Sequence, residues 1–577
     1  MKRYWKYIRP YLPFFILGPF LMLSEVAGEI VLPKIMATMI DNGVMQNYGT
    51  SYIIGQALKM AGCILIMICG GIGGHYFSIK ASVLFSADLR KDIFKKVQGF
   101  SFGDVDKFST GSLVTRLTND ITQLQNFVRM ALIMAMRSPG MLIGGIIMAC
   151  TINARLALML ALVLPLLALS IGLLMKTAFP RFGIMQKKLD SLNSGIQENI
   201  TNVRVIKSFV REKFEIKKFG AANDDLTDST LRAMNIVIMT MPLMTFVMNA
   251  TTLAVVWLGG HFVIGGSMRV GDLSAFSTYI VQILSSLMMV SMVILQSSRA
   301  AASAKRIREV LDTESTLNDD NASMKDKKVT KGSVEFKNVS FKYYSSREEN
   351  ILSDISFKAE PGQIVGIVGT TGSGKTTLVQ LIPRLYDVTS GEVLVDGINV
   401  KEYGLKNLRD GVGMVLQKNV LFSGTIEENL KWGDENATHD EVRNAANAAQ
   451  ADGFVSEFTD GYNMELGQGG VNVSGGQKQR LCIARALLKK PKILILDDST
   501  SAVDTATEAK IRNSFKNELK DTTKIIIAQR ISSVMDADKI IVLENGRIAG
   551  EGTHDELLKT NREYQDIYYS QADKEVS

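Results

Sequence analysis

The sequence predicts an α-helical membrane domain over residues 1–310, with six spans and long cytoplasmic extensions, followed by an α/β domain over residues 334–577. Three observations lead to this fold class. Apolar segments of span length recur in the first half, short strands and helices alternate from about residue 330, and a glycine-rich loop joins a predicted strand to a predicted helix. The polar and charged segment 311–333 is the predicted linker.

Six segments of the first half reach the length of about 20 apolar residues that a bilayer span needs. Buried core helices of a large soluble protein are the alternative, but such a core would not repeat these lengths so regularly. The predicted spans are 14–39, 52–79, 130–152, 156–176, 235–262 and 273–294. The basic segment before them, which contains Pro10 and Pro13, is expected to be an interfacial helix.

Charge sets the predicted orientation of the spans. Lys and Arg gather before the first span, between the second and third, and between the fourth and fifth, while the other connections carry few besides Arg155 and Arg269. Because positively charged loops stay in the cytoplasm, we expect the amino terminus and the α/β domain there. The net charge of +7 is then explained by this excess of positive charge in the cytoplasmic loops of a protein that spans a lipid bilayer, and not by nucleic-acid binding, which would also require a recognisable binding module.

The two cytoplasmic segments, about 80–129 and 176–234, keep a helical periodicity with mixed charges, so the spans are expected to continue as helices beyond the membrane. Each segment has a turning point with aromatic residues between charges, at 99–108 and 207–214. Such stretches suit short helices that dock into grooves of another domain. A solvated surface turn is the alternative for each.

A glycine-rich loop follows the apolar run 364–368 and opens into a predicted helix at Lys375. This is the setting of a phosphate-binding loop, whose backbone N–H groups and helix N-terminus bind a nucleoside triphosphate, and a chance match is improbable with a strand and a helix on its two sides. Lys375 is expected to reach the β- and γ-phosphates. The predicted cofactor-binding residues here are Gly369, Thr370, Thr371, Gly372, Ser373, Gly374, Lys375, Thr376 and Thr377.

Two oxygen groups are predicted to hold Mg²⁺. The Thr376 hydroxyl is one, and Asp497, directly after the apolar run 493–496, is the other. A buried parallel strand would carry this carboxylate to the phosphate end of the sheet. ATP and Mg²⁺ are therefore the predicted cofactors.

Further motifs make the whole chain resemble a half-transporter of the ABC exporter family, of the B type found in multidrug exporters. Two sets of three spans with cytoplasmic extensions precede an ATPase module, and four short motifs follow in the family's order. These motifs are 339–343, ending in Tyr343; 414–417, ending in Gln417; 473–477, with Val473 where Leu is usual; and 501–504. The resemblance implies an ATP hydrolase coupled to transmembrane transport, in the plasma (bacterial cytoplasmic) membrane.

The resemblance also implies a role for each motif. Tyr343 corresponds to the aromatic residue that stacks on adenine, and Gln417 to the glutamine that links Mg²⁺ and the attacking water to the membrane-facing subdomain. The segment 501–504 corresponds to the loop through which two ATP sites sense each other. The signature residues, expected to bind the γ-phosphate held by the opposite subunit, are Ser474, Gly475, Gly476 and Gln477.

Two positions depart from the family's pattern. Asp498 stands where the family has the Glu that polarises the attacking water, and Gln529 stands where it has a His that contacts the γ-phosphate. Asp is one methylene shorter than Glu, and a shift of about 1 Å can cost on the order of 10²-fold in rate. Gln cannot become cationic at physiological pH, as His can. Neutral drift is the alternative for either substitution alone.

Both departures fall in one site, which resembles the degenerate subunit of a heterodimeric exporter. The resemblance then implies that this chain's own site is slow, and that its signature completes a fast site on a second half-transporter, which carries Glu and His. The implied catalytic residues are Asp498, Gln529 and Gln417. The implied function is export of amphiphilic compounds, such as drugs, lipids or peptides.

Two glutamates lie in the first predicted span. Glu25 and Glu29 are four residues apart and share one helix face, where an ionisable group costs about 2.5–3.5 kcal/mol at the bilayer centre. They are candidate contacts for a cationic amphiphilic substrate, the alternative being an ion pair with Lys34, His75 or Arg137. Three further hypotheses stay open: an uptake transporter on the exporter fold, as for siderophores, a slow homodimeric exporter, and an ATP-binding membrane protein without transport.

Overall fold

The chain folds into two compact units. The computed structural model describes residues 3–320, 322–343, 349–499 and 502–576. One unit comprises Met1–Lys96 with Gly111–Thr313, and the other comprises Val97–Thr110 with Glu314–Ser577. The division at Thr313 falls within the predicted linker, whose Leu317 and Val329 are buried in the second unit. The short segment Val97–Thr110 leaves the membrane unit and belongs to the second unit.

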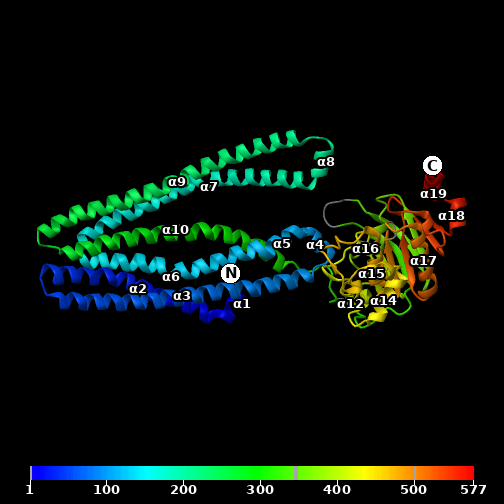
Figure 1. The fold of residues 1–577 in the computed structure, drawn as a ribbon, viewed down its shortest axis with the longest axis horizontal. Helices are drawn as coiled ribbons and strands as arrows, with labels where there is room; N and C mark the ends of the chain where they lie inside the picture. Colours follow the sequence, from blue (N-terminus) through cyan, green and yellow to red (C-terminus); the bar gives the residue numbers. More distant parts are fainter. Residues whose placement is uncertain (1–2, 321, 344–348, 500–501, 577) are drawn as a thin grey trace. The chain divides into compact units, whose positions relative to one another are not determined.

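Helices are the only regular secondary structure among the described residues of the membrane unit, with short connections between them (Figure 1). Six of its helices are long and apolar enough to span a bilayer, which confirms the predicted number of spans. Its helices are α1 (Trp5–Ile8), α2 (Leu12–Thr38), α3 (Thr50–Gln98), α5 (Thr110–Thr115), α6 (Ile121–Ile152), α7 (Ala154–Thr201), α8 (Val203–Ser208), α9 (Glu212–Ile264) and α10 (Val270–Asp312).

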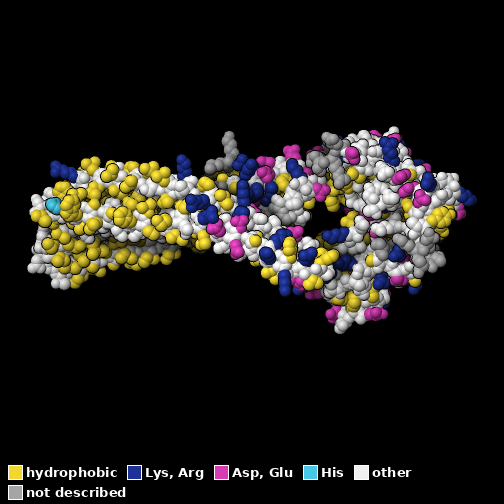
Figure 2. Space-filling view, turned by 90° about the horizontal axis from the view of Figure 1, so that it is seen from above, with side chains coloured by type: hydrophobic (Ala, Val, Ile, Leu, Met, Phe, Trp, Pro, Cys, Tyr) yellow, Lys and Arg dark blue, Asp and Glu magenta, His cyan; other side chains and the backbone are white. Residues whose placement is uncertain are grey.

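The longest helices exceed what a bilayer requires. Helix α7 has 48 residues and α9 has 53, so at 1.5 Å per residue each is about 70–80 Å long. A hydrocarbon core is about 30 Å thick, so more than half of each helix extends beyond it. Figure 2 shows the change in surface, because apolar side chains cover the spans while charged side chains gather along the extensions.

The membrane helices pack as two groups. Helix α10 packs along α6 and α2, whereas α7 and α9 pack along each other and diverge from the other helices toward the end where α8 joins them (Figure 1). An apolar cluster joins the two groups at the opposite end, where Leu160, Val255 and Phe276 are buried together.

The second unit is an α/β fold with two main sheets. A four-stranded antiparallel sheet has the order β2-β1-β4-β5, and a six-stranded sheet has the order β12-β11-β3-β10-β9-β6, parallel except for β12. The strands are β1 (Val334–Phe341), β2 (Leu352–Ala359), β3 (Ile364–Gly369), β4 (Ser390–Val395), β5 (Ile398–Asn399), β6 (Val412–Val415), β7 (Gly424–Thr425), β8 (Glu465–Leu466), β9 (Ile493–Asp497), β10 (Thr523–Ile527), β11 (Lys539–Glu544) and β12 (Arg547–Gly552).

Helices cover the six-stranded sheet, and its central strands are nearly continuous apolar runs, as expected for a parallel sheet buried on both faces. Strands β3, β9 and β10 are neighbours, so their carboxyl ends meet at one edge. The helices are α4 (Phe102–Phe108), α11 (Lys375–Gln380), α12 (Leu405–Asp410), α13 (Ile426–Leu430), α14 (His439–Ala448), α15 (Asp452–Glu457), α16 (Gly475–Leu488), α17 (Thr505–Glu518), α18 (His554–Thr560) and α19 (Arg562–Val576).

Asp396 fastens the start of this unit. Its carboxylate accepts hydrogen bonds from four consecutive backbone N–H groups, those of residues 330–333, at 2.7–3.0 Å. Burial raises the pKa of Asp396, but the four hydrogen bonds outweigh it and hold the pKa below its ordinary value. The segment entering β1 is thereby fixed against the turn after β4.

Asp396→Asn is expected to destabilise the second unit by about 1–3 kcal/mol at pH 7, because an amide nitrogen would face N–H donors. A lowered pKa gives stability that is present above the unfolded value and lost as the pH falls through the folded value. The difference between wild type and variant should therefore shrink below about pH 4. Calorimetric melting of the full-length chain measures it, and an undiminished difference at pH 3 would contradict this account.

Candidate functional site

The glycine-rich loop joins the buried strand β3 to helix α11. Its last residue, Gly374, adopts a left-handed conformation with φ of 96°, and a Cβ there would come within 2.8 Å of Leu352. Only glycine accommodates both constraints. A glycine at this position is typical of the tight turn of a phosphate-binding loop.

Lys375 folds back into this loop. Its amine donates hydrogen bonds to the carbonyl oxygens of Gly369 and Thr370, both at 2.8 Å. Burial lowers the pKa of Lys375, while the nearby carboxylates of Asp497 and Asp498 oppose that shift. The amine is thus held at the loop, where it can neutralise a phosphate group.

Asp497 ends β9 directly beside the loop and is only 1% exposed. Its Oδ1 accepts a hydrogen bond from the Thr376 hydroxyl at 3.0 Å, while its buried Oδ2 has no partner among the described residues. Burial raises the pKa of Asp497, and the Thr376 hydrogen bond partly offsets it. A hydroxyl beside an incompletely satisfied carboxylate fits Mg²⁺, which prefers oxygen ligands. When bound with ATP, Mg²⁺ would neutralise phosphate charge.

The two residues that depart from the family's pattern meet in the structure. Asp498 follows β9 with a left-handed φ of 48° and donates its backbone N–H to Ile527 at the end of β10. The Gln529 amide then donates a hydrogen bond to Oδ2 of Asp498 at 2.7 Å. The two side chains that depart from the family's pattern are thus in direct contact, and the Gln529 amide sets the position of the Asp498 carboxylate.

The signature segment begins helix α16. Ser474 is its N-cap, and Ser474 and Gln477 exchange side-chain to backbone hydrogen bonds at 2.9 and 3.3 Å in a capping box. Gln477 is therefore engaged in the cap, whereas Ser474 and Gly475 are exposed. Gly476 lies against the following loop, where a Cβ would come within 2.8 Å of the Ala502 carbonyl.

Comparisons with known proteins agree with this arrangement. The ABC transporter transmembrane region matches residues 15–287, and the ABC transporter family of ATPase domains matches 352–501. The chain is 39% identical to the uncharacterized ABC transporter ATP-binding protein YfiB of Bacillus subtilis, over the whole of both chains. It belongs to the ABC transporter family.

Two further relatives show the type of ABC transporter. The putative multidrug export ATP-binding/permease protein YgaD of Bacillus subtilis is 33% identical over 98% of each chain. A solved bacterial Atm1-family ABC exporter with ATP bound superimposes with a TM-score of 0.79 at 25% identity, over 98% of each chain. The fold is therefore that of an exporter half, in which the ABC domain hydrolyses ATP to drive transport.

Tyr343 stands beside the phosphate-binding loop of the transporter. Its hydroxyl shares a hydrogen bond of 2.9 Å with the Thr377 hydroxyl, and its ring packs edge-on against Phe341 and Tyr386. The structure thus brings Tyr343 to the nucleotide site. Ser501, in the motif 501–504, lies outside the described residues.

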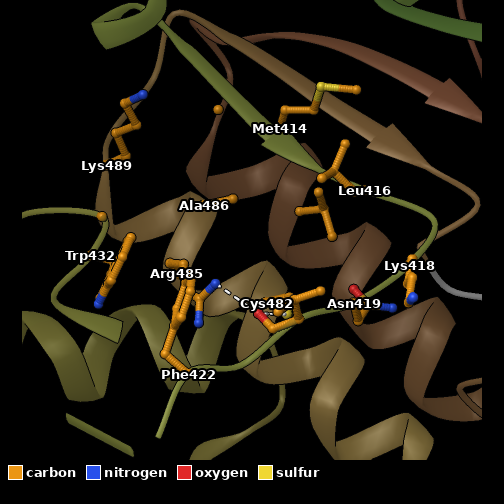
Figure 3. A pocket seen from close by; sticks show the side chains of 14 residues that line it. Met414, Leu416, Lys418, Asn419, Phe422, Trp432, Cys482, Arg485, Ala486 and Lys489 are labelled. Atoms are coloured by element: carbon orange, nitrogen blue, oxygen red, sulfur yellow. Dashed lines mark hydrogen bonds between the residues drawn. The ribbon is translucent and has the colours of Figure 1, made fainter. Parts of the chain in front are cut away.

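Gln417 is exposed two residues after β6, and its sequence neighbours Leu416 and Lys418 line a pocket of about 320 Å³ (Figure 3). Phe422 and Trp432 stack face to face on one side of this pocket, with ring centroids 4.1 Å apart. Arg485 fixes the pocket's loop through hydrogen bonds to the carbonyls of Val420 and Asn429. The pocket therefore adjoins the loop that carries the predicted water-linking glutamine.

Gln479 is a site residue that the sequence motifs did not reveal. It is 2% exposed on α16, donates to the carbonyl of Asp498 at 3.3 Å and accepts from the backbone N–H of Ala502 at 3.0 Å. One side chain thereby joins the signature helix to the segments on both sides of residue 500. Gln479 lies about one helical turn after the signature glycines, and this spacing was the sequence signal that could have identified it.

The turning point 99–108 contains helix α4, which packs within the ATPase unit. Asp104, 3% exposed, accepts hydrogen bonds from Ser101 and from the backbone N–H of Thr316. The Tyr386 hydroxyl donates to Asp106 at 3.0 Å, and the Phe102 and Tyr386 rings are 6.1 Å apart. Tyr386 also contacts Tyr343, so α4 and the nucleotide site share one aromatic neighbour.

The two membrane glutamates both pair with Arg137 of α6. Arg137 lies 3.0 Å from the Glu25 carboxylate and 2.8 Å from that of Glu29. Of the three partners considered, Arg137 is thus the one found, while Lys34 pairs with Asp272. Both glutamates are thus engaged in ion pairs, while Oε2 of Glu25 has no hydrogen-bond partner among the described residues, and their assignment to substrate binding stays a prediction.

Proposed function

We propose that this chain is the degenerate-site half of a heterodimeric ABC exporter that moves amphiphilic compounds out of the cytoplasm, across the plasma membrane. Its own site binds ATP and Mg²⁺ but hydrolyses slowly. Its signature helix completes the competent site of a second half-transporter, which carries Glu and His where this chain has Asp498 and Gln529.

One observation carries the proposal: the Gln529 amide is hydrogen-bonded to the Asp498 carboxylate, 2.7 Å away. Both substitutions affect the same chemical step. Asp498 replaces the residue that polarises the attacking water, Gln529 replaces the residue that stabilises the γ-phosphate, and the transition state needs both contributions. The residues proposed to bind ATP and Mg²⁺ are retained: Lys375 is hydrogen-bonded to the loop, and Thr376 to Asp497. Binding without transition-state stabilisation gives occupancy without rate.

The signature residues support the second half of the proposal. Ser474 and Gly475 are exposed at the start of a 14-residue helix, whose terminal N–H groups and dipole favour an anion. The phosphate they suit is the γ-phosphate on another chain. The slow homodimer is the competing arrangement, in which the phosphate belongs to a second copy.

Amphiphilic cargo follows from the membrane half. Methionine is abundant there, including Met234, Met239 and Met248 on α9, and flexible thioethers suit a promiscuous apolar pocket. The multidrug-export relative supports the same substrate class.

The pocket beside Gln417 is proposed to transmit ATP hydrolysis to the membrane half of the second half-transporter. Its stacked Phe422 and Trp432 offer an apolar surface, and the end of helix α8 offers Phe209 and Val210, which are both largely exposed. The equivalent short helix of the second half-transporter is the proposed occupant, in the manner of a helix in a groove.

Single-turnover trapping tests the division of labour. After the co-expressed pair has turned over labelled ATP once, about one ATP should remain per pair, bound to this chain's site. Asp498→Glu with Gln529→His should abolish that retention, since it restores the weak site. Equal amounts of ADP released from both sites at equal rates would refute the proposal and favour the homodimer-like alternative.

A further inference from the structure

We propose that Gln571, on the C-terminal helix α19, is a positioning residue for the ATP site. Its Nε2 donates a hydrogen bond of 2.8 Å to the backbone carbonyl of Gln529, and its Oε1 accepts one of 2.9 Å from the backbone N–H of Ile531. One side chain thus clasps the backbone on both sides of Arg530, in the loop that follows β10.

The rest of this loop is tied to other elements. At its start, Ala528 donates its N–H to Ile367 of β3 at 3.2 Å. At its far end, Arg512 donates to the carbonyl of Ser532, and the Ser533 hydroxyl donates to the buried Glu508, both partners lying on α17. Gln571 therefore supports the middle of the loop, where Gln529 projects toward Asp498.

A primary amide is suited to this task. It carries a donor and an acceptor on one planar group, and the loop presents a carbonyl and an N–H to it. A carboxylate could accept from Ile531 but would repel the Gln529 carbonyl, and an alanine could do neither. The clasp thus requires Gln for both of its hydrogen bonds.

Loss of the Gln571 hydrogen bonds is expected to change the rate of ATP hydrolysis and not the affinity for the nucleotide. The Gln529 amide reaches Asp498 only while its backbone is held, and a displacement of about 1 Å in such a group can cost on the order of 10²-fold. The groups that hold ATP and Mg²⁺, namely Lys375, Thr376 and Asp497, lie on other elements. The clasp is therefore expected to affect hydrolysis alone.

The test measures single-turnover ATP hydrolysis and ATP binding by full-length protein assembled from this chain alone, in lipid nanodiscs, where every ATP site carries Asp498 and Gln529. Gln571→Ala should lower the hydrolysis rate about 3- to 10-fold at unchanged ATP affinity. Gln565→Ala is the matched control, because Gln565 lies on the same helix but donates to Leu558, outside the loop. It should leave the rate within about 2-fold of wild type.

A double-mutant cycle separates positioning from general stabilisation. In a Gln529→Ala background, Gln571→Ala should have almost no further effect, because residues that act through one another are not additive. Additive losses, an equal loss in Gln565→Ala, or weaker ATP binding would overturn the proposal. If Gln571→Ala fails to fold, Gln571→Glu, which keeps the acceptor for Ile531, serves in the same cycle with the same criteria.

Discussion

Gly475→Asp in this chain is expected to lower ATP turnover of the assembled pair by at least about 10²-fold. Gly475 is exposed at the first position of α16. A carboxylate there would occupy the positive end of the helix and repel the phosphate that the signature is proposed to bind, and losing one such stabilising group costs about 10²–10³-fold. Steady-state ATPase assays of the co-expressed pair measure the effect.

Gly475→Ala is the matched control for that experiment. Among the described residues, a Cβ at position 475 meets the Ala502 methyl group at 3.8 Å, an ordinary contact, whereas at Gly476 it would meet a backbone carbonyl at 2.8 Å. Gly475→Ala should therefore keep most of the activity.

Asp498→Asn should lower the ATP turnover of the pair by less than about 3-fold, since it affects only the slow site. A greater loss from Asp498→Asn than from Gly475→Asp would reverse the assigned roles.

The second large effect is a gain. Protein assembled from this chain alone should hydrolyse ATP slowly, and Asp498→Glu combined with Gln529→His should raise its turnover about 10- to 100-fold. The longer carboxylate regains its reach, and an imidazole replaces the amide that now engages Asp498. General acid–base groups typically contribute about 10²–10⁴-fold, so a partial recovery falls in this range.

Asp498→Gln with Gln529→His is the control for this experiment. Gln has nearly the size of Glu but no carboxylate, so it shows whether a gain depends on the negative charge or only on the longer side chain. This variant should show no gain. Unmodified protein of this chain alone that runs at about 10 s⁻¹, the rate of a median enzyme, would show that the site is not degenerate.

Residues on short, contiguous motifs were predictable from the sequence. The strand, loop and helix around Lys375, and the apolar run that carries Asp497, place their groups through local structure alone, and the structure brings both to one edge of the sheet. The six spans were predictable for a similar reason, since each is a continuous apolar segment.

Contacts between distant segments were not predictable. Gln479, Gln571 and Arg137 act through single side chains that reach residues 19 to 112 positions away, and no spacing rule specifies such pairs. The structural division also differs from a simple boundary near residue 313, because 97–110 packs within the ATPase unit. The segment 97–110 is short and mixed in composition, so the sequence does not indicate which unit it packs with, and only its contacts in the structure show this.

The ion pairs of Arg137 have a mechanical consequence. One guanidinium joins α6 to two successive turns of α2, and the Gln282 amide and Tyr279 hydroxyl of α10 donate to the carbonyls of Glu29 and Ile30 at 3.1 and 2.6 Å. Sliding α6 against α2 by one turn would separate two partly buried carboxylates from their counter-charge, and sliding α10 would break both hydrogen bonds to the α2 carbonyls. We therefore expect α2, α6 and α10 to move as one body, and the α7–α9 pair, which meets them at the apolar cluster around Leu160, Val255 and Phe276, to be the part that can change its angle.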